Sequence, residues 1–170
     1  MSKTIIRVVL AGLTVFGLLV VAAFALYWKS TSMRPSQPIR FPHHIHMEQA
    51  GLNCAHCHPY ADKSPVAGIP AVKVCMDCHQ NVATNKPEVK KLKAFWDKQQ
   101  PIPWSKVHQL PWHVYFTHKR HIKAGIDCSQ CHGNVGMMTV DRKVRSLRMG
   151  WCLNCHREKH ALTDCSTCHK

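Results

Sequence analysis

The chain has 170 residues, which by length alone suggests one domain. Its 23 Lys and Arg against 9 Asp and Glu give a formal charge of +14, a balance that ordinarily indicates a nucleic-acid or acidic membrane partner. Its ten cysteines would suit a secreted disulfide scaffold, but their spacing argues against that class, and we expect no nucleic-acid partner.

The N-terminal segment is predicted to cross a membrane. Val8–Trp28 contains 21 residues and no charge, which is enough to span a bilayer as a helix. Tyr27 and Trp28 end this stretch, where aromatic residues commonly lie at the membrane interface. Lys3 and Arg7 favour a cytoplasmic N-terminus. We therefore expect residues 1–29 to form a single-pass anchor in the bacterial cytoplasmic membrane, with the rest of the chain on the periplasmic side.

A cleaved signal peptide is the alternative for this segment. Ala23-Phe24-Ala25 is similar to an A-x-A cleavage site. The apolar run is longer than the hydrophobic region of a usual signal peptide, which favours the anchor. Prolines and polar residues follow, so residues 30–40 are predicted to form an extended linker.

The ten cysteines form five C-x-x-C pairs, and a histidine directly follows each pair. C-x-x-C-H is the attachment signature of c-type haem. The two thiols add to the vinyl groups of the porphyrin, and the imidazole of the next residue can bind the iron. Four-ligand zinc sites and structural disulfides fit five such units poorly, because each unit has its own histidine. We therefore expect five haem c groups with their irons. The attaching cysteines are Cys54, Cys57, Cys75, Cys78, Cys128, Cys131, Cys152, Cys155, Cys165 and Cys168, and the proximal iron ligands are His58, His79, His132, His156 and His169.

An internal repeat covers much of the predicted haem domain, residues 41–170. Phe41–His46 and Phe116–His121 both read F-x-H-x-x-H, and each precedes a C-x-x-C-H motif by a short spacer. A further motif follows in each case, so we expect two related two-haem units at about residues 41–82 and 116–156. The fifth haem belongs to residues 160–170.

Regular structure should be sparse, because five large apolar cofactors would form much of the core. Lys86–Gln99 is predicted to form a helix that packs over a haem edge, with Pro87 at its first position. The proline-rich residues 101–112 indicate an ordered loop. The predicted fold is mostly irregular, with short α-helices packed around five haems and one N-terminal transmembrane helix. The haem propionates, about ten in all, would offset part of the positive charge.

Five haems need up to five further axial ligands. The H-x-x-H pairs supply four candidates, and the two imidazoles of a pair can serve neighbouring haems. These candidates are His43, His46, His118 and His121. For the fifth ligand the sequence leaves His108 and Met149 open, with His160 third, and a methionine ligand would raise the potential of its haem. The other histidines are expected at the surface or beside propionates: His44, His56 and His113.

Several longer segments carry a family resemblance. They are F-x-H-x-x-H followed by Asn53–His58, Ala67-Gly68-Ile69-Pro70, Val74–His79, Lys106–Pro111, the second F-x-H-x-x-H and Met149–His156. Together they resemble the pentahaem cytochrome c subunit of alternative complex III, over about Phe41 to His156. The resemblance implies a respiratory membrane complex in which a quinol is oxidised. It also implies an iron–sulfur subunit, polytopic quinol-binding subunits, and a monohaem cytochrome c or another soluble acceptor as partners.

The expected function is electron transport, with no catalytic site in this chain itself. A free-standing, membrane-anchored multihaem quinol dehydrogenase is one alternative. A multihaem oxyanion reductase is another, and it would need an open axial position on one iron. The C-x-x-C-K signature of the active haem in pentahaem nitrite reductases does not occur in the sequence.

Overall fold

The computed structural model describes residues 2–33 and 35–170. The helices are α1 (Lys3–Met33), α2 (Cys54–Cys57), α3 (Val72–His79), α4 (Pro87–Asp97), α5 (His118–Lys123), α6 (Cys128–His132), α7 (Met149–Glu158) and α8 (Cys165–Cys168), with a π-helical turn η1 (Ile45–Gln49) and a 3-10 turn η2 (Val135–Met137). Within the described residues, the isolated bridge between Val114 and His169 is the one β-type pairing. This confirms the predicted class of short helices in a mostly irregular chain.

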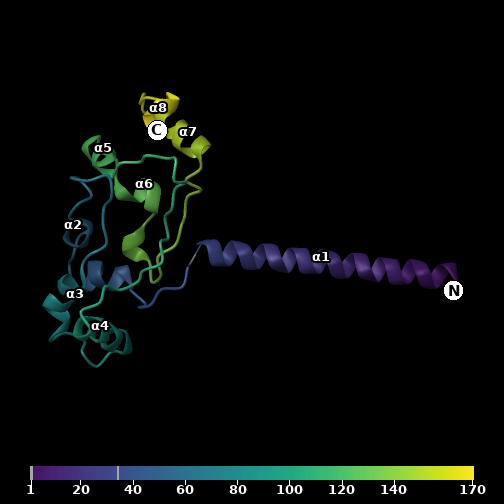
Figure 1. Cartoon of the computed structure of the whole chain (residues 1–170), viewed down its shortest axis with the longest axis horizontal. Helices are drawn as coiled ribbons and strands as arrows, with labels where there is room; N and C mark the ends of the chain where they lie inside the picture. Colours follow the sequence, from purple (N-terminus) through teal and green to yellow (C-terminus); the bar gives the residue numbers. More distant parts are fainter. Residues whose placement is uncertain (1, 34) are drawn as a thin grey trace.

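The N-terminal helix α1 projects away from the rest of the molecule (Figure 1). Its stretch Lys3–Trp28 is long and apolar enough to cross a membrane, and none of it is buried within the protein. The Thr14 hydroxyl donates to the Leu10 carbonyl at 2.9 Å, which satisfies that polar group inside the apolar stretch.

The helix continues to Met33, past the expected anchor boundary at residue 29 and into the expected linker. The first proline after the anchor is Pro35, and a helix commonly ends just before the residue that precedes a proline. No earlier proline or glycine interrupts residues 18–34. Two residues of the predicted anchor and linker, Met1 and Arg34, lie outside the described residues.

The side-chain core is very small. Among the described residues, the buried hydrophobic side chains are Ile39, Met76, Leu92 and Ile102. They join α3 and α4 to the segment that follows α1 and to the proline-rich loop. No described side chain falls below 2 % exposure, so side chains alone do not fill the interior of this domain.

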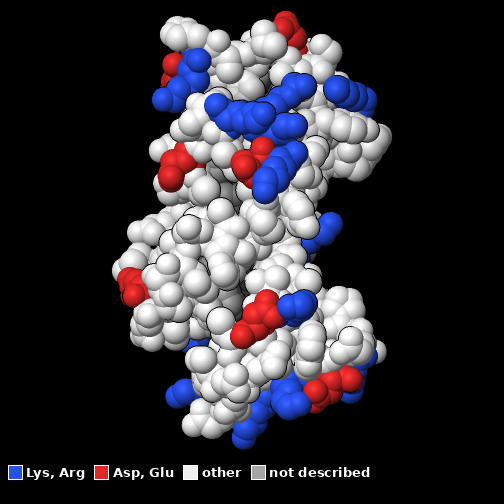
Figure 2. All heavy atoms as spheres, turned by 90° about the vertical axis from the view of Figure 1, so that its left-hand side faces the viewer, with Lys and Arg blue, Asp and Glu red and all other residues white. Residues whose placement is uncertain are grey.

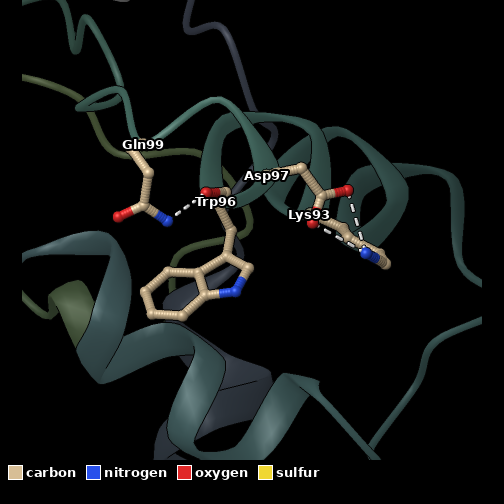
Figure 3. Close-up of polar contacts among 4 residues, drawn as sticks. All are labelled: Lys93, Trp96, Asp97 and Gln99. Carbon is tan, nitrogen blue, oxygen red and sulfur yellow. Dashed lines mark hydrogen bonds and ion pairs between the residues drawn. The ribbon is translucent and has the colours of Figure 1, made fainter.

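Helix α4 confirms the predicted helix at residues 86–99, with Pro87 in its first turn. Trp96 is partly buried against the core, as Figure 3 shows. Gln99 donates its amide N–H to the Trp96 carbonyl at 2.8 Å, and Lys93 pairs with Asp97 at 2.8 Å on the exposed side. The helix therefore has one packed side and one solvated, charged side.

Hydrogen bonds attach the segment after α1 to the domain. The Gln37 side chain donates to the Ser105 carbonyl at 2.8 Å and accepts from the Ser105 N–H at 2.9 Å. The Arg40 N–H donates to Glu88 of α4 at 2.7 Å. Because both contacts join residues far apart in the sequence, they fix where the polypeptide leaves the anchor.

Candidate haem sites

Each C-x-x-C pair lies on a short helix. Helices α2, α6 and α8 begin at the first cysteine of a motif, and α3 and α7 contain a motif in their later turns. Cysteines three positions apart on a helix share one face. The Asn53 side chain accepts from the His56 N–H, and the Asp127 side chain accepts from the Ser129 N–H, so two of these short helices have an N-terminal cap.

All ten thiols are free in the structure, with no disulfide among them. Neighbouring motifs bring their thiols together. Burial raises the pKa of the Cys75 thiol, and the nearby Cys57 raises it further. Burial also raises the pKa of the Cys128 thiol, and the nearby Cys54 raises it further. The first motifs of the two repeat units therefore meet at Cys54 and Cys128.

The same proximity continues toward the C-terminus. The pKa of Cys131 is raised by burial and then by Cys155 and Cys152. The pKa of Cys152 is raised by burial and then by Cys168. The attachment sites thus follow one another in space in the order α3, α2, α6, α7, α8, as Figure 1 shows. In the sequence α2 comes before α3, so the spatial order reverses these two motifs.

Four of the five motif histidines present Nε2 for a ligand. In these four Nδ1 lies near a backbone carbonyl oxygen: His58 at 2.6 Å from Gly68, His79 at 3.0 Å from Val82, His156 at 2.6 Å from Leu162, and His169 at 3.2 Å from His113. A carbonyl only accepts, so Nδ1 must carry the proton and Nε2 keeps its lone pair. This is the tautomer that an iron-binding imidazole requires.

Three of the four H-x-x-H histidines have the same arrangement. Nδ1 donates to the Pro42 carbonyl in His46 at 3.1 Å, to the Pro65 carbonyl in His118 at 2.9 Å, and to the Thr117 carbonyl in His121 at 2.8 Å. These acceptors are backbone carbonyl groups, which every residue has, so the sequence alone does not predict which of them accepts from a histidine.

The phenylalanine of each F-x-H-x-x-H segment contacts both of its histidines. The Phe41 ring stacks on His46 at 4.3 Å and meets His43 edge-on at 4.9 Å. Phe116 lies 4.4 Å from His121 and meets His118 edge-on at 4.8 Å. The repeat in the sequence is therefore also a repeat in geometry.

Histidines from the two kinds of segment face each other in pairs. The ring centroids lie 6.0 Å apart for His46 and His79, 6.3 Å for His118 and His132, and 6.1 Å for His121 and His156. Two imidazoles on opposite sides of one metal, each with a metal–nitrogen bond of about 2 Å, would have centroids about 6 Å apart. The separations fit an iron between the rings.

The pairing follows the repeat. The second histidine of each H-x-x-H faces the second motif of its unit, and His118 faces the first motif of the second unit. His43 lies near His58, the first motif of the first unit; burial lowers the pKa of His43, and His58 lowers it further against the opposing effect of Asp141. Burial, together with His108 and His118, lowers the pKa of His132 to about 4.

The fifth site is built differently. His169 has its Nδ1 near the carbonyl oxygen of His113 and its ring 5.4 Å from the His113 ring. His108 lies instead beside His132, with ring centroids 4.3 Å apart, and Met149 is 65 % exposed. The assignment of His108 or Met149 to the fifth iron stays a prediction. His113 is exposed, as expected, but its backbone carbonyl orients a motif histidine.

One cavity adjoins the motif on α3. It has a volume of about 340 Å³, and its lining includes Met76, His79, Val89, Lys90, Lys93 and Trp96. The apolar side chains suit a porphyrin face, and the two lysines suit carboxylates such as propionates. With the small side-chain core and the opposed histidine pairs, this lining shows that the residues present fit covalently attached haem.

Basic side chains gather on one face of the domain. Figure 2 shows a cluster of lysine and arginine in the upper part of this face, at the height of α5 in Figure 1, with some acidic side chains beside it and further basic side chains at the lower end. Helix α5 contributes the exposed Lys119, Arg120 and Lys123. The Lys119 N–H donates to the Ser64 carbonyl. The backbone of Lys63, the residue before Ser64, therefore lies near this face. A surface of this kind attracts an acidic partner.

Comparison with known proteins assigns a family to both parts of the chain. The class III cytochrome C family matches residues 25–109, half of the chain, and the family of cytochrome c7 and related cytochrome c matches residues 114–170. The menaquinone reductase multihaem cytochrome c subunit of Nitratidesulfovibrio vulgaris (strain Hildenborough) is 34 % identical over 118 residues, 67 % of this chain and 55 % of that protein. The chain thus spans about half the length of this relative.

These matches agree with the residues at the sites. The boundary between the two matched regions falls between the two repeat units, and every C-x-x-C-H motif lies inside one of them. Members of these families carry covalently bound c-type haem, and the thiols and histidines described above provide for it. The chain belongs to the class III cytochrome C family and is a multihaem c-type cytochrome.

Proposed function

We propose that this protein transfers electrons through five covalently attached haem c groups as a membrane-anchored subunit of a quinone-linked complex. The observation that carries the proposal is the continuous series of five attachment sites, in which successive motifs bring their thiols together. Four histidine candidates from the H-x-x-H segments lie beside four of the motif histidines.

The chain's residues have separate tasks in this function. Each cysteine pair attaches one porphyrin, and the histidine after it supplies one axial nitrogen. The H-x-x-H histidines supply the opposite nitrogens, held in the right tautomer by backbone carbonyls. When bound, the haems supply one-electron chemistry, and attachment sites this close together suit transfer from one to the next.

The partners come from the resemblance and the relative together. We propose a complex of the alternative complex III type, with an iron–sulfur subunit and polytopic quinol-binding subunits in the membrane. Electrons would pass to a monohaem cytochrome c or another periplasmic acceptor. Helix α1 would anchor the chain, with its N-terminus in the cytoplasm and the haem domain in the periplasm. The basic face around α5 suits an acidic redox partner.

The opposite direction of electron flow is the second candidate. The relative is named as a subunit of a menaquinone reductase, which delivers electrons to the quinone. The present chain would then accept electrons from a periplasmic donor and pass them to the membrane. Both directions use the same five sites, so only a measurement on the assembled complex separates them.

The first experiment counts the haems. The intact mass of the purified chain should exceed that of the polypeptide by five haem masses, with an alkaline pyridine haemochrome of the c type. A Cys54→Ala and Cys57→Ala variant should lose one haem mass and keep four. A mass without haem would end the proposal, and a count other than five would correct the number of sites.

The second experiment addresses the complex and its direction. Affinity purification of the full-length chain from mildly solubilised membranes should recover an iron–sulfur subunit and polytopic membrane subunits. A menaquinol analogue should then reduce the haems of the complex if it oxidises quinol. If reduced periplasmic cytochrome instead drives reduction of a menaquinone analogue, the reductase direction holds. A chain that purifies alone and oxidises quinol by itself would contradict the complex and support a free-standing dehydrogenase.

A further inference from the structure

Three buried polar side-chain atoms have no hydrogen-bond partner within the part of the chain that the structure describes. They are His43 Nδ1, His108 Nε2 and Asp141 Oδ1. A buried polar atom without a partner costs about 1–3 kcal/mol, and most native structures contain few of them. None of the three is hydrogen-bonded to another in this structure, so two potential donors and one potential acceptor remain to be paired.

The three residues share one neighbourhood. The His44 N–H donates to the Met138 carbonyl at 3.4 Å, which brings the first H-x-x-H segment next to the segment that contains Asp141. Burial lowers the pKa of both His43 and His108, and in each case Asp141 is the next largest influence and raises the pKa. The carboxylate therefore lies within electrostatic range of both imidazoles.

His43 also differs from the other candidate ligands of its type. His46, His118 and His121 each donate Nδ1–H to a backbone carbonyl. His43 has no such carbonyl, although it occupies the same position in its repeat as His118. A ligand imidazole almost always donates its second N–H to a carbonyl, carboxylate or water.

We propose that Asp141 is a positioning residue for His43: once haem is bound, the carboxylate accepts the His43 Nδ1–H, a bond that is not made in this structure, so that Nε2 is free to bind the iron at the first attachment site. This inference rests on the haem binding proposed above. A carboxylate makes the imidazole more basic than a carbonyl does, and a more basic ligand favours ferric iron. The haem bound by His43 therefore has a lower potential than it would with a carbonyl acceptor.

The test is a redox titration of the full-length holoprotein carrying Asp141→Asn. The asparagine carbonyl still accepts the Nδ1–H but has no charge, so five low-spin haems should remain. One of them should titrate at a more positive potential while the other four are unchanged. Asp141→Leu removes the acceptor, and one haem should then show a partial high-spin ferric signal in electron paramagnetic resonance. Asp62→Asn is the matched control, because Asp62 is exposed in the turn that follows α2.

The His43→Met background assigns the effect to one ligand. In that background Asp141→Asn should no longer shift any potential. Unchanged potentials in Asp141→Asn with all five haems present would overturn the inference, as would a shift that persists in His43→Met. If Asp141→Leu does not mature, the Asp141→Asn titration decides alone. A wild-type chain with fewer haems would instead contradict the proposed function, so the two failures are distinguishable by mass.

Discussion

Gly133 directly follows the histidine of the third motif and takes a conformation that other residues avoid. Its φ is 72° and its ψ is −169° at the C-terminal end of α6. An added Cβ would lie 2.7 Å from Cγ2 of Val144. The backbone region costs a residue with a Cβ about 1–3 kcal/mol, and the contact adds an overpacking cost of about 1 kcal/mol or more. We expect Gly133→Ala to lower the free energy of unfolding by about 2–4 kcal/mol.

Substitutions at two other glycines test the backbone strain and the contact with Val144 separately. Gly125 has φ 75° with nothing within 4 Å of an added Cβ, so Gly125→Ala tests backbone strain alone, at about 1–2 kcal/mol. Gly150 lies in α7 with open space around it, so Gly150→Ala should be neutral or stabilise by up to about 1 kcal/mol. In a Val144→Ala background, Gly133→Ala should cost about 1 kcal/mol less than in the wild type.

The measurement is thermal unfolding of the holoprotein, followed by circular dichroism and by the haem absorbance. A change of 1 kcal/mol shifts the midpoint by about 4 °C in a domain of this size. Gly133→Ala should therefore melt about 8–16 °C below the wild type. A Gly133→Ala variant as stable as Gly150→Ala would refute both the strain and the contact with Val144.

The remaining predictions concern the linker, one helix cap and the last attachment site. Gln37→Ala should lower the unfolding free energy by about 1–3 kcal/mol in denaturant titrations, because both hydrogen bonds to Ser105 are lost; Gln99→Ala, which loses a local exposed bond, should change little. Hydrogen bonds from Ser129 lower the pKa of Asp127 below its ordinary value of 3.8. The wild type should therefore be more stable than Asp127→Asn above pH 3.8. This advantage should disappear as the pH falls through the lower pKa of the folded protein. An advantage that grows in acid would contradict this. A Cys165→Ala and Cys168→Ala variant should lose one haem by mass and leave the spectra of the other four unchanged, since α8 lies at one end of the series of sites.

Local motifs predicted the local parts of the fold and of the sites. The C-x-x-C-H motifs specify short helices because their geometry depends on adjacent residues, and α4 follows from Pro87 and an apolar face. Helix α1 continues four residues past the predicted anchor, into residues assigned to the linker from their polar composition, because the first residue that prevents a helix is Pro35.

The partners of the histidines were not predictable in the same way. The carbonyls that accept from Nδ1 belong to residues such as Gly68, Val82 and Leu162. Every residue has a carbonyl, so only the path of the loops decides which one is used. The pairing of His46 with His79 likewise depends on a fold that joins residues 33 positions apart.

The spatial order of the sites explains what the repeat contributes. The two units meet through their first motifs, at Cys54 and Cys128, so their second motifs point outward. Four sites arranged in this way would have two equivalent ends. The fifth motif extends one end only, beside Cys152, while the other end packs against α4 and the core next to the linker. The two ends therefore present different surfaces. A series of sites with unlike ends can have a different partner at each end, as the electron transfer proposed above requires.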